Sequence, residues 1–215
     1  MSDVYDVTIV GGGPAGMFAA FYCGLHDLHA QLIESLPELG GQIAALYPEK
    51  KIWDVGGIPG ISGADLVKQF KAQLAVRPVD TFLGETVTNV SQNNDGTLTI
   101  TTPKRISQTK SVVIALGNGA FSPRPLKAEG AKLLNDQQLV YAIQHKDDYA
   151  GKRVMVFGGG DSAIDNALLL SSVAQEVHLV HRWKSFRGLE SSVDQLDHSS
   201  VDVLKPFVAK KVVPQ

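Results

Sequence analysis

The stretch GGGPAG at residues 11–16 decides the fold of this chain, because a second copy, GGGDSA, stands at residues 158–163. Each copy follows an apolar run that predicts a strand, Tyr5–Val10 in the first case and Arg153–Phe157 in the second. Glycine lets the backbone turn tightly and approach a pyrophosphate, and the N-terminus of the helix that follows then presents free N–H groups to the phosphates. In this strand–turn–helix context the repeated pattern predicts two dinucleotide-binding units.

The residues at the tips of the next strands distinguish the two units. Glu34 follows Gly11 by 23 positions, and His181, with Arg182 directly after it, follows Gly158 by the same 23. A carboxylate at this place accepts hydrogen bonds from an adenosine ribose and repels a 2′-phosphate, whereas a cationic tip favours the phosphate. The pattern predicts FAD or NAD in the first unit and NADP in the second. Two such sites in one chain indicate electron transfer between two cofactors.

The expected fold class is α/β, with two Rossmann-like dinucleotide-binding domains of the three-layer ββα type at residues 1–120 and 121–215. A small antiparallel meander is expected within the first domain, because β-forming segments surround a hairpin turn at Asn93–Gly96. Its strands are predicted at Thr86–Val90, Leu98–Thr102 and Ser111–Ile114. The chain is then expected to return over Val112–Gly117 as a buried strand of the parallel sheet.

The segment between the second strand and residue 63 is expected to be long and irregular, because glycine and proline recur from residue 56 onward. Such a segment is more often functional than idle. Ser62 or Gly63 is predicted to cap a helix over residues 64–74, whose apolar side chains recur on one face.

Composition excludes several classes of function. The 215-residue chain has a net charge of −2 and a pI near 6.3, which gives no reason to expect nucleic acid or a membrane surface as partner. No apolar run is long enough to span a bilayer, and the N-terminus is too short and too acidic for a signal peptide, so a cytoplasmic location is expected. Cys23 is the single cysteine, which excludes an intrachain disulfide. The six histidines show no ligand spacing, so no metal site is expected.

Several segments match one known pattern in combination: residues 11–16, Glu34, Gly40–Gln42, Tyr47–Lys50, residues 115–124, residues 158–165, and His181-Arg182 with Phe186-Arg187. With them the chain resembles the ferredoxin–NADP reductases of the thioredoxin-reductase-like type over essentially its whole length. The resemblance implies FAD in the first unit, NADPH in the second, hydride transfer from nicotinamide to flavin, and single electrons leaving to ferredoxin or flavodoxin. It also implies a homodimer. No catalytic side chain is expected, because the flavin carries the reaction.

The resemblance also implies roles for individual residues. Glu34 would hold the adenosine ribose, Val87 would touch the adenine, and Gln42 and Tyr47 would line the flavin with Phe121 nearby. Arg182 and Arg187 would lie near the 2′-phosphate. The candidate cofactor-binding residues are Gly11, Gly13, Pro14, Ala15, Gly16, Glu34, Gly41, Gln42, Tyr47, Val87, Gly117, Phe121, Gly158, Gly160, Asp161, Ser162, His181, Arg182 and Arg187.

Three departures from the family pattern matter. Residues 128–151 contain no cysteine, which excludes the dithiol exchange of thioredoxin reductase itself. Trp183 stands where the family commonly has a second arginine, and it is expected to stack on adenine or on Arg182, with Lys184 replacing the charge. The family's C-terminal segment with a further Gly-Asp pair has no counterpart here, so the chain is expected to be a fragment or a natural truncation.

Other interpretations of the same residues stay open. Arg182 and Arg187 also fit a solvated basic patch, and Tyr47 fits an ordinary loop aromatic. The acceptor leaves no motif, so a quinone or a separate thiol protein is an alternative to ferredoxin. A redox-inactive nucleotide-binding fragment is the alternative outside enzymology.

Overall fold

The protein is described here by a computed structural model that covers residues 4–119 and 123–214. The chain divides into two compact units, Met1–Ser122 and Pro123–Gln215, and each unit is described by itself. Within the described residues, no helix is both long enough and apolar enough to cross a membrane.

The first unit is built on a six-stranded mixed sheet with the strand order β5-β2-β1-β8-β7-β6. The strands are β1 (Tyr5–Val10), β2 (Ala30–Glu34), β5 (Asp80–Leu83), β6 (Asn89–Gln92), β7 (Leu98–Thr101) and β8 (Ile106–Ile114). The first four in the order β5-β2-β1-β8 are parallel, and β8-β7-β6 form an antiparallel meander. The predicted hairpin turn is present, since Gly96 donates its N–H to the Asn93 carbonyl at 3.1 Å.

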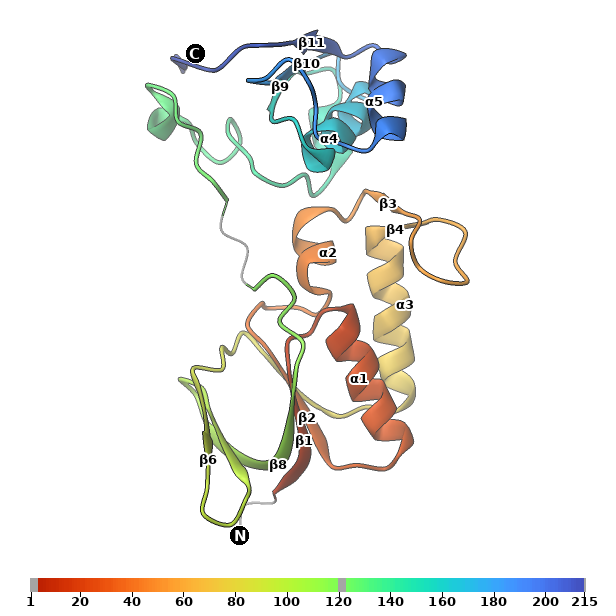
Figure 1. The fold of residues 1–215 in the computed structure, drawn as a ribbon, viewed down its shortest axis with the longest axis vertical. Helices are drawn as coiled ribbons and strands as arrows, with labels where there is room; N and C mark the ends of the chain where they lie inside the picture. Colours follow the sequence, from red (N-terminus) through yellow and green to blue (C-terminus); the bar gives the residue numbers. More distant parts are fainter. Residues whose placement is uncertain (1–3, 120–122, 215) are drawn as a thin grey trace. The chain divides into compact units, whose positions relative to one another are not determined.

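Helix α1 (Pro14–Leu25) packs over β1 and β2, and α3 (Gly63–Val76) lies beside α1 on the same face of the sheet (Figure 1). Ile9 of β1 and Leu32 of β2 are fully buried in a cluster with Met17, Ala20 and Leu74 from the two helices. Burial of such side chains supplies the main favourable term of folding, about 1.5–3 kcal/mol for each large one.

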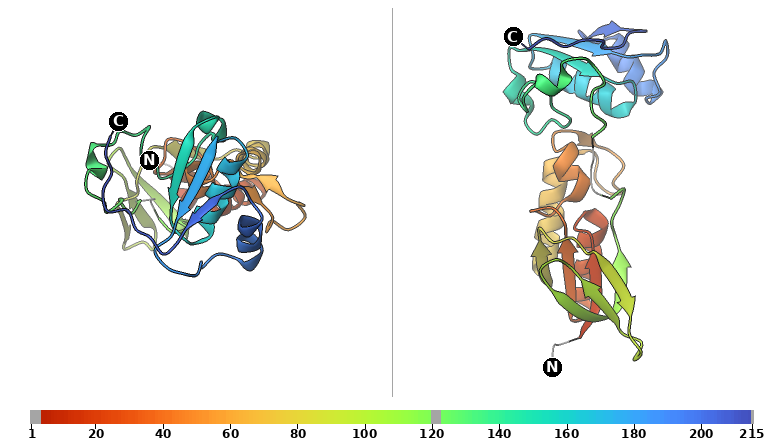
Figure 2. Two further views of the ribbon diagram at one scale, coloured as in Figure 1. Left: turned by 90° about the horizontal axis from the view of Figure 1, so that it is seen from above. Right: turned by 90° about the vertical axis from the view of Figure 1, so that its left-hand side faces the viewer.

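The meander forms the third layer of the first unit, on the side of the parallel strands opposite to α1 (Figures 1 and 2). Gln31 of β2 donates hydrogen bonds to the hydroxyls of Thr8 in β1 and Ser107 in β8, at 2.8 and 2.7 Å. The guanidinium carbon of Arg105, between β7 and β8, lies 3.4 Å from the centre of the Phe82 ring in β5. These contacts bring the ends of the sheet together, and the three-layer α/β architecture predicted from the sequence is confirmed.

Two local predictions for the first unit are wrong. The strand expected at Thr86–Val90 begins only at Asn89, because residues 84–88 hydrogen-bond to the loop after β2 and to the end of β7 instead. The expected buried strand ends at Ile114, and its last residues are exposed, with Val113 at 38% and Ile114 at 63%. The helices pack mainly on β1, on β2 and on each other, with little contact to β8, so this end of β8 is left uncovered.

The segment expected to be irregular contains short regular elements. Helix α2 (Gly41–Leu46) begins directly after Gly40, and β3 (Lys51–Ile52) pairs with β4 (Ile61–Ser62) in a small antiparallel ladder. Elements of six and two residues are too short to produce a recognisable apolar period in the sequence.

The second unit has a three-stranded parallel sheet of β9 (Arg153–Phe157), β10 (Glu176–Val180) and β11 (Asp202–Leu204), in the order β11-β10-β9. Helices α4 (Asp161–Ser171) and α5 (Glu190–Asp197) pack together at one face, around a core that includes Ile164, Leu170, Leu179 and Leu196. Two 3₁₀ turns, η1 (Ala131–Leu133) and η2 (Lys146–Tyr149), precede the sheet.

Ser62 caps α3 as expected, and this supports a stability prediction. Its Oγ accepts the Asp65 N–H at 3.1 Å and donates to the Asp65 carboxylate at 2.7 Å. We predict that Ser62→Ala lowers the free energy of unfolding by about 1 kcal/mol, because the helix loses a partner for one of its unpaired N–H groups. Urea denaturation followed by circular dichroism would measure the change. Ser91→Ala, at an exposed position of β6, is the matched control and should shift stability by less than about 0.5 kcal/mol; equal effects of the two substitutions would contradict the capping role.

Candidate functional site

The first glycine turn is shaped by close backbone approaches. Gly11, with φ of +111°, donates its N–H to the Ile33 carbonyl at 2.9 Å, and a Cβ atom at this position would collide with the Ala115 carbonyl. A Cβ atom at Gly16 would collide with the carbonyl of Gly11. The protein's own packing therefore requires glycine at the first and last positions of the turn.

Gly13 and Gly160, the equivalent middle glycines of the two turns, are different. Gly13 has an ordinary φ of −73°, and a Cβ atom there would meet nothing closer than 4.0 Å. Gly160 has φ of −103°, and nothing lies within 4 Å of its Cβ position. Neither backbone conformation nor packing demands glycine, yet both turns have it, and both residues are the N-caps of their helices. A ligand that lies against the backbone, as a pyrophosphate does, accounts for both.

The helices that follow the two turns differ at their N-termini, and only the first has no acidic residue there. Helix α1 begins with Pro14, has no side-chain cap and has no acidic residue in its first turn, so no side chain of the helix itself compensates the positive end of its dipole. Helix α4 begins with Asp161, whose Oδ1 accepts the Leu189 N–H at 2.8 Å, and continues with the exposed Ser162. Asp161 thereby ties the loop before α5 to the start of α4.

Glu34 lies directly against the first turn. Its side chain is buried, with Oε2 accepting the Gly12 N–H at 2.5 Å and Oε1 accepting the Leu36 N–H at 2.8 Å. A Cβ atom on Gly12 would lie only 3.0 Å from the Cβ of Glu34 and 2.6 Å from Cδ2 of Leu39. The carboxylate is thus held at the turn by charge-assisted hydrogen bonds, in a position to accept hydroxyl groups of a ribose.

The second turn has the same register. Gly158 donates its N–H to the Val180 carbonyl at 3.1 Å, which is the counterpart of the bond from Gly11 to Ile33. His181 occupies the place of Glu34, and a Cβ atom on Gly159 would collide with its ring. The ring is buried, its Nε2 donates to the Ser185 carbonyl at 3.0 Å, and it stacks on Phe186. His181 was expected to form part of a cationic strand tip that faces a phosphate. Its ring is instead buried and packs against Gly159 of the turn.

Positive charge at the second turn comes from the loop that follows His181. Arg182, Lys184 and Arg187 are exposed, and the Arg187 N–H donates to the Gly159 carbonyl at 2.8 Å, which fixes the loop beside the turn. The Arg182 guanidinium lies 5.5 Å from the centre of the Trp183 ring, in agreement with one of the two stacking arrangements expected. None of the three cations forms an ion pair with a carboxylate of the described residues. An exposed cationic loop next to a glycine turn fits a phosphate group.

The other predicted residues of the first unit lie at varying distance from the turn. Gly41 packs against it, because a Cβ atom there would lie 2.9 Å from the Gly13 Cα. Gln42 donates to the Gly119 carbonyl at 3.3 Å, close to the left-handed Gly117. Tyr47 directly follows α2, and within the described residues no side-chain hydrogen bond joins it to the turn. Val87 lies in the segment after β5, and Phe121 lies outside the described residues.

Sequence reasoning missed Gly12 and Gly159, the glycines that admit Glu34 and His181. A signal was present, since both turns contain three consecutive glycines where the fingerprint requires only the first and third. Gly40 was also missed as part of the site, although its N–H donates to the Gly12 carbonyl at 2.9 Å.

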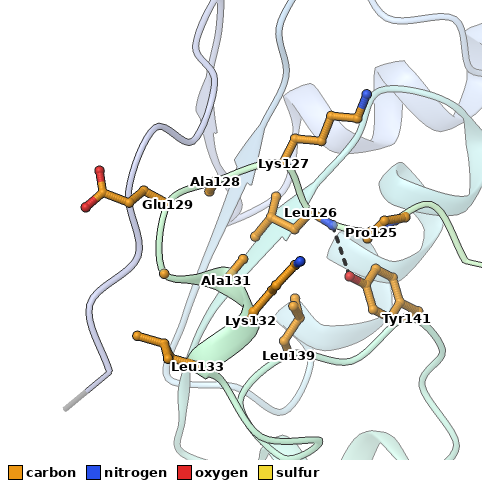
Figure 3. Close-up of a pocket in the computed structure, with 11 residues that line it drawn as sticks. Pro125, Leu126, Lys127, Ala128, Glu129, Ala131, Lys132, Leu133, Leu139 and Tyr141 are labelled. Atoms are coloured by element: carbon orange, nitrogen blue, oxygen red, sulfur yellow. Dashed lines mark hydrogen bonds between the residues drawn. The ribbon is translucent and has the colours of Figure 1, made fainter.

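A hollow of about 650 Å³ lies elsewhere in the second unit (Figure 3). It is lined mainly by apolar side chains of residues 125–133 with Leu139 and Tyr141, and the Tyr141 hydroxyl accepts the Leu126 N–H at 3.0 Å. It contains none of the predicted binding residues. Within the described residues, no group of three or more His, Cys, Asp and Glu side chains could hold a metal ion.

The residues of both turns lie within one known pattern. The family model for pyridine nucleotide-disulphide oxidoreductases matches residues 5–199. The chain belongs to this family. It is 61% identical over 207 residues to a ferredoxin–NADP reductase of Limosilactobacillus reuteri, covering 96% of this chain and 62% of the relative. It is 58% identical to that of Limosilactobacillus fermentum, covering 98% of this chain and 64% of the relative. The chain therefore spans slightly less than two thirds of these relatives.

Among solved structures, thioredoxin reductase from Lactococcus lactis matches with a TM-score of 0.80 and 25% identity, covering 98% of this chain and 67% of that one. This chain has one cysteine, Cys23, on α1. Burial raises the pKa of the Cys23 thiol, which disfavours the thiolate that thiol chemistry requires.

The middle glycines generate a prediction. We expect Gly13→Ala and Gly160→Ala to leave the stability of the unliganded chain within about 0.5 kcal/mol, because a methyl group fits at both positions. Dinucleotide affinity should fall about tenfold or more in the altered unit only, because the methyl group keeps a pyrophosphate off the backbone. Isothermal titration calorimetry with FAD and NADP⁺ would measure this. Gly12→Ala is the contrasting variant, since its methyl group would displace Glu34 and destabilise the unliganded chain. Undiminished affinity in the first two variants would remove the argument for a ligand at these glycines.

Proposed function

We propose that this chain is a flavoprotein oxidoreductase that passes a hydride from NADPH to FAD and then electrons to ferredoxin or flavodoxin. The observation that carries the proposal is the contrast between two equivalent turns. One turn holds a buried carboxylate, Glu34, and the other lies beside an exposed loop with three cations. The names of the relatives, ferredoxin–NADP reductases, support NADP as one of the two coenzymes.

FAD fits the first unit. The open Cβ position at Gly13 leaves room for the pyrophosphate at the start of α1, and Glu34 would accept the ribose hydroxyls. Gly41 packs closely against Gly13 of the turn. Gln42, whose side chain bonds the Gly119 carbonyl near Gly117, would line the isoalloxazine ring together with Tyr47. NADP fits the second unit, with the pyrophosphate at Gly160 and Ser162 and the 2′-phosphate at Arg182 and Arg187.

The chemistry of the reaction belongs to the flavin, which accepts a hydride and releases electrons one at a time. The side chains of this protein bind and orient. Glu34 excludes a 2′-phosphorylated ribose from the first turn by charge, and the cations of the second turn favour it. Backbone N–H groups at the start of α1 and at the start of α4 would hold the pyrophosphates. The hydride and electron transfers require no nucleophile activated by a base among the described residues, because the flavin is the reacting group.

The acceptor and the assembly are proposed from the relatives and the family resemblance. The names of the relatives favour ferredoxin, with flavodoxin, a quinone or a separate thiol protein as alternatives. Stopped-flow reoxidation of the reduced protein with each acceptor would discriminate among them. We also propose a homodimer, which light scattering of the purified chain would test.

Activity with an artificial acceptor is the first functional prediction. The purified chain, loaded with FAD, should oxidise NADPH with ferricyanide, and it should oxidise NADH much more slowly, because the second turn offers cations to a 2′-phosphate. The flavin spectrum would confirm loading, and the chain without FAD is the control. Stoichiometric FAD without turnover would overturn the enzymatic proposal and favour a nucleotide-binding module.

Selectivity for the 2′-phosphate is the second prediction. Arg182→Ala combined with Arg187→Ala should raise the KM for NADPH about tenfold or more, since each charge-assisted hydrogen bond is worth about 1.5–3 kcal/mol. The KM for NADH should change by less than about twofold, because NADH lacks the phosphate. Lys210→Ala removes an exposed cation elsewhere in the same unit and should alter neither constant. An equal rise for NADH and NADPH would show that the arginines act on the fold rather than on the phosphate.

A further inference from the structure

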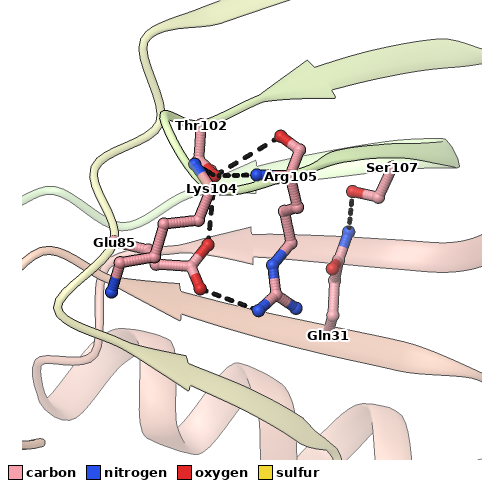
Figure 4. Close-up of polar contacts among 6 residues, drawn as sticks. All are labelled: Gln31, Glu85, Thr102, Lys104, Arg105 and Ser107. Atoms are coloured by element: carbon pink, nitrogen blue, oxygen red, sulfur yellow. Dashed lines mark hydrogen bonds and ion pairs between the residues drawn. The ribbon is translucent and has the colours of Figure 1, made fainter.

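A buried polar layer lies between the meander and the parallel strands of the first unit (Figure 4). Its centre is an ion pair in which Nη2 of Arg105 donates to Oε1 of Glu85 at 2.7 Å, with the Glu85 side chain only 4% exposed. The second carboxylate oxygen of Glu85 accepts the Thr102 hydroxyl at 3.0 Å. Phe82 covers the guanidinium from the side of β5. The Glu85 carboxylate is therefore held from two directions.

Stability alone is a poor explanation for this ion pair. Two buried atoms of the layer, Oε1 of Gln31 and Nε of Arg105, have no hydrogen-bond partner among the described residues. Taking charges out of water and leaving polar atoms unpartnered both cost free energy, and well-packed apolar residues often replace such a pair without loss. A function in fixing local geometry explains the pair better.

The geometry that the pair controls is that of residues 84–88, which we call the strap. On one side the strap donates the Gly84 N–H to the Leu36 carbonyl and the Glu85 N–H to the Glu34 carbonyl, both at 2.9 Å. On the other side Thr88 donates its N–H to the Thr101 carbonyl at 2.8 Å, at the end of β7. The strap thus connects the main chain at Glu34 with the meander.

Val87 lies within the strap, between its two anchored ends. The side chain of Glu85 is the link that joins these ends through the interior, because its backbone bonds Glu34 while its carboxylate is held by Thr102 and Arg105. A change at Arg105, in the turn between β7 and β8, therefore reaches the Glu34 loop without any direct contact with it.

We infer that the Arg105–Glu85 ion pair positions the strap for the adenosine half of the dinucleotide bound by the first unit. The inference rests on the proposed FAD site and adds positioning residues that the fingerprint does not contain. Arg105 acts through Glu85, and Glu85 acts through the main chain at Glu34 and through Val87. Holding these groups in place before the ligand arrives lowers the ordering cost of binding.

The test compares Arg105→Met, Glu85→Gln and the double variant Arg105→Met with Glu85→Met. The dissociation constants for FAD and for ADP, which shares its adenosine end, should rise about tenfold in all three. The melting temperature of the unliganded double variant should stay near that of the wild type, because no buried charge is left alone. Affinity for NADP⁺ at the second unit should be unchanged. Lys104→Met removes an exposed cation from the same turn and is the matched control.

A stable double variant that binds FAD as tightly as the wild type would overturn the inference, because the pair would then be only structural. A loss for FAD that ADP does not share would also overturn it, by placing the effect at the flavin end. Wild-type protein that binds ADP but no FAD would overturn the proposed function alone, and the ADP measurements would still test the strap. Wild-type protein that binds neither ligand would overturn both.

Discussion

The first unit depends on the absence of side chains where three backbone segments converge. Gly11 lies against the carbonyl of Ala115 at the end of β8, and Gly16 lies against the carbonyl of Gly11. Gly12 lets the side chain of Glu34 reach the turn. Because a methyl group at any of these positions would collide with its neighbours, the same constraint that closes the α/β core also places a carboxylate at the start of α1.

The second unit repeats this construction with different chemistry. The first glycine donates to the residue before the strand tip in both units, and the second glycine leaves room for the tip side chain. In the second unit the tip side chain is the imidazole of His181, which is buried, stacks on Phe186 and packs against the turn. The exposed positive charges lie in the loop that follows His181. Selectivity for a 2′-phosphate would therefore depend on a loop tied to the turn by one backbone hydrogen bond, from Arg187 to Gly159.

The middle glycines and the polar layer are features that position a cofactor and take no part in the reaction themselves. Gly13 and Gly160 have no packing reason to be glycine, which leaves the approach of a ligand as the physical explanation. The layer around Glu85 contains polar atoms that have no hydrogen-bond partner in the described part of the chain, which an apolar core would avoid, and it connects the meander to the main chain beside Glu34. In both places the protein contributes position rather than a reacting group, as expected where a cofactor carries the chemistry.

The two glycine turns, their strands and helices, and the capping of α3 by Ser62 were predictable from the sequence, because each rests on local rules of backbone geometry and spacing. The acidic tip at Glu34 also followed from counting positions. Tertiary structure decided what local rules do not reach: the inward packing of His181, the exposure of Ile114, and the joining of Arg105 to Glu85 across 20 positions of sequence. These depend on which surfaces of the sheet its helices and meander cover, and that is settled only when segments far apart in sequence pack together.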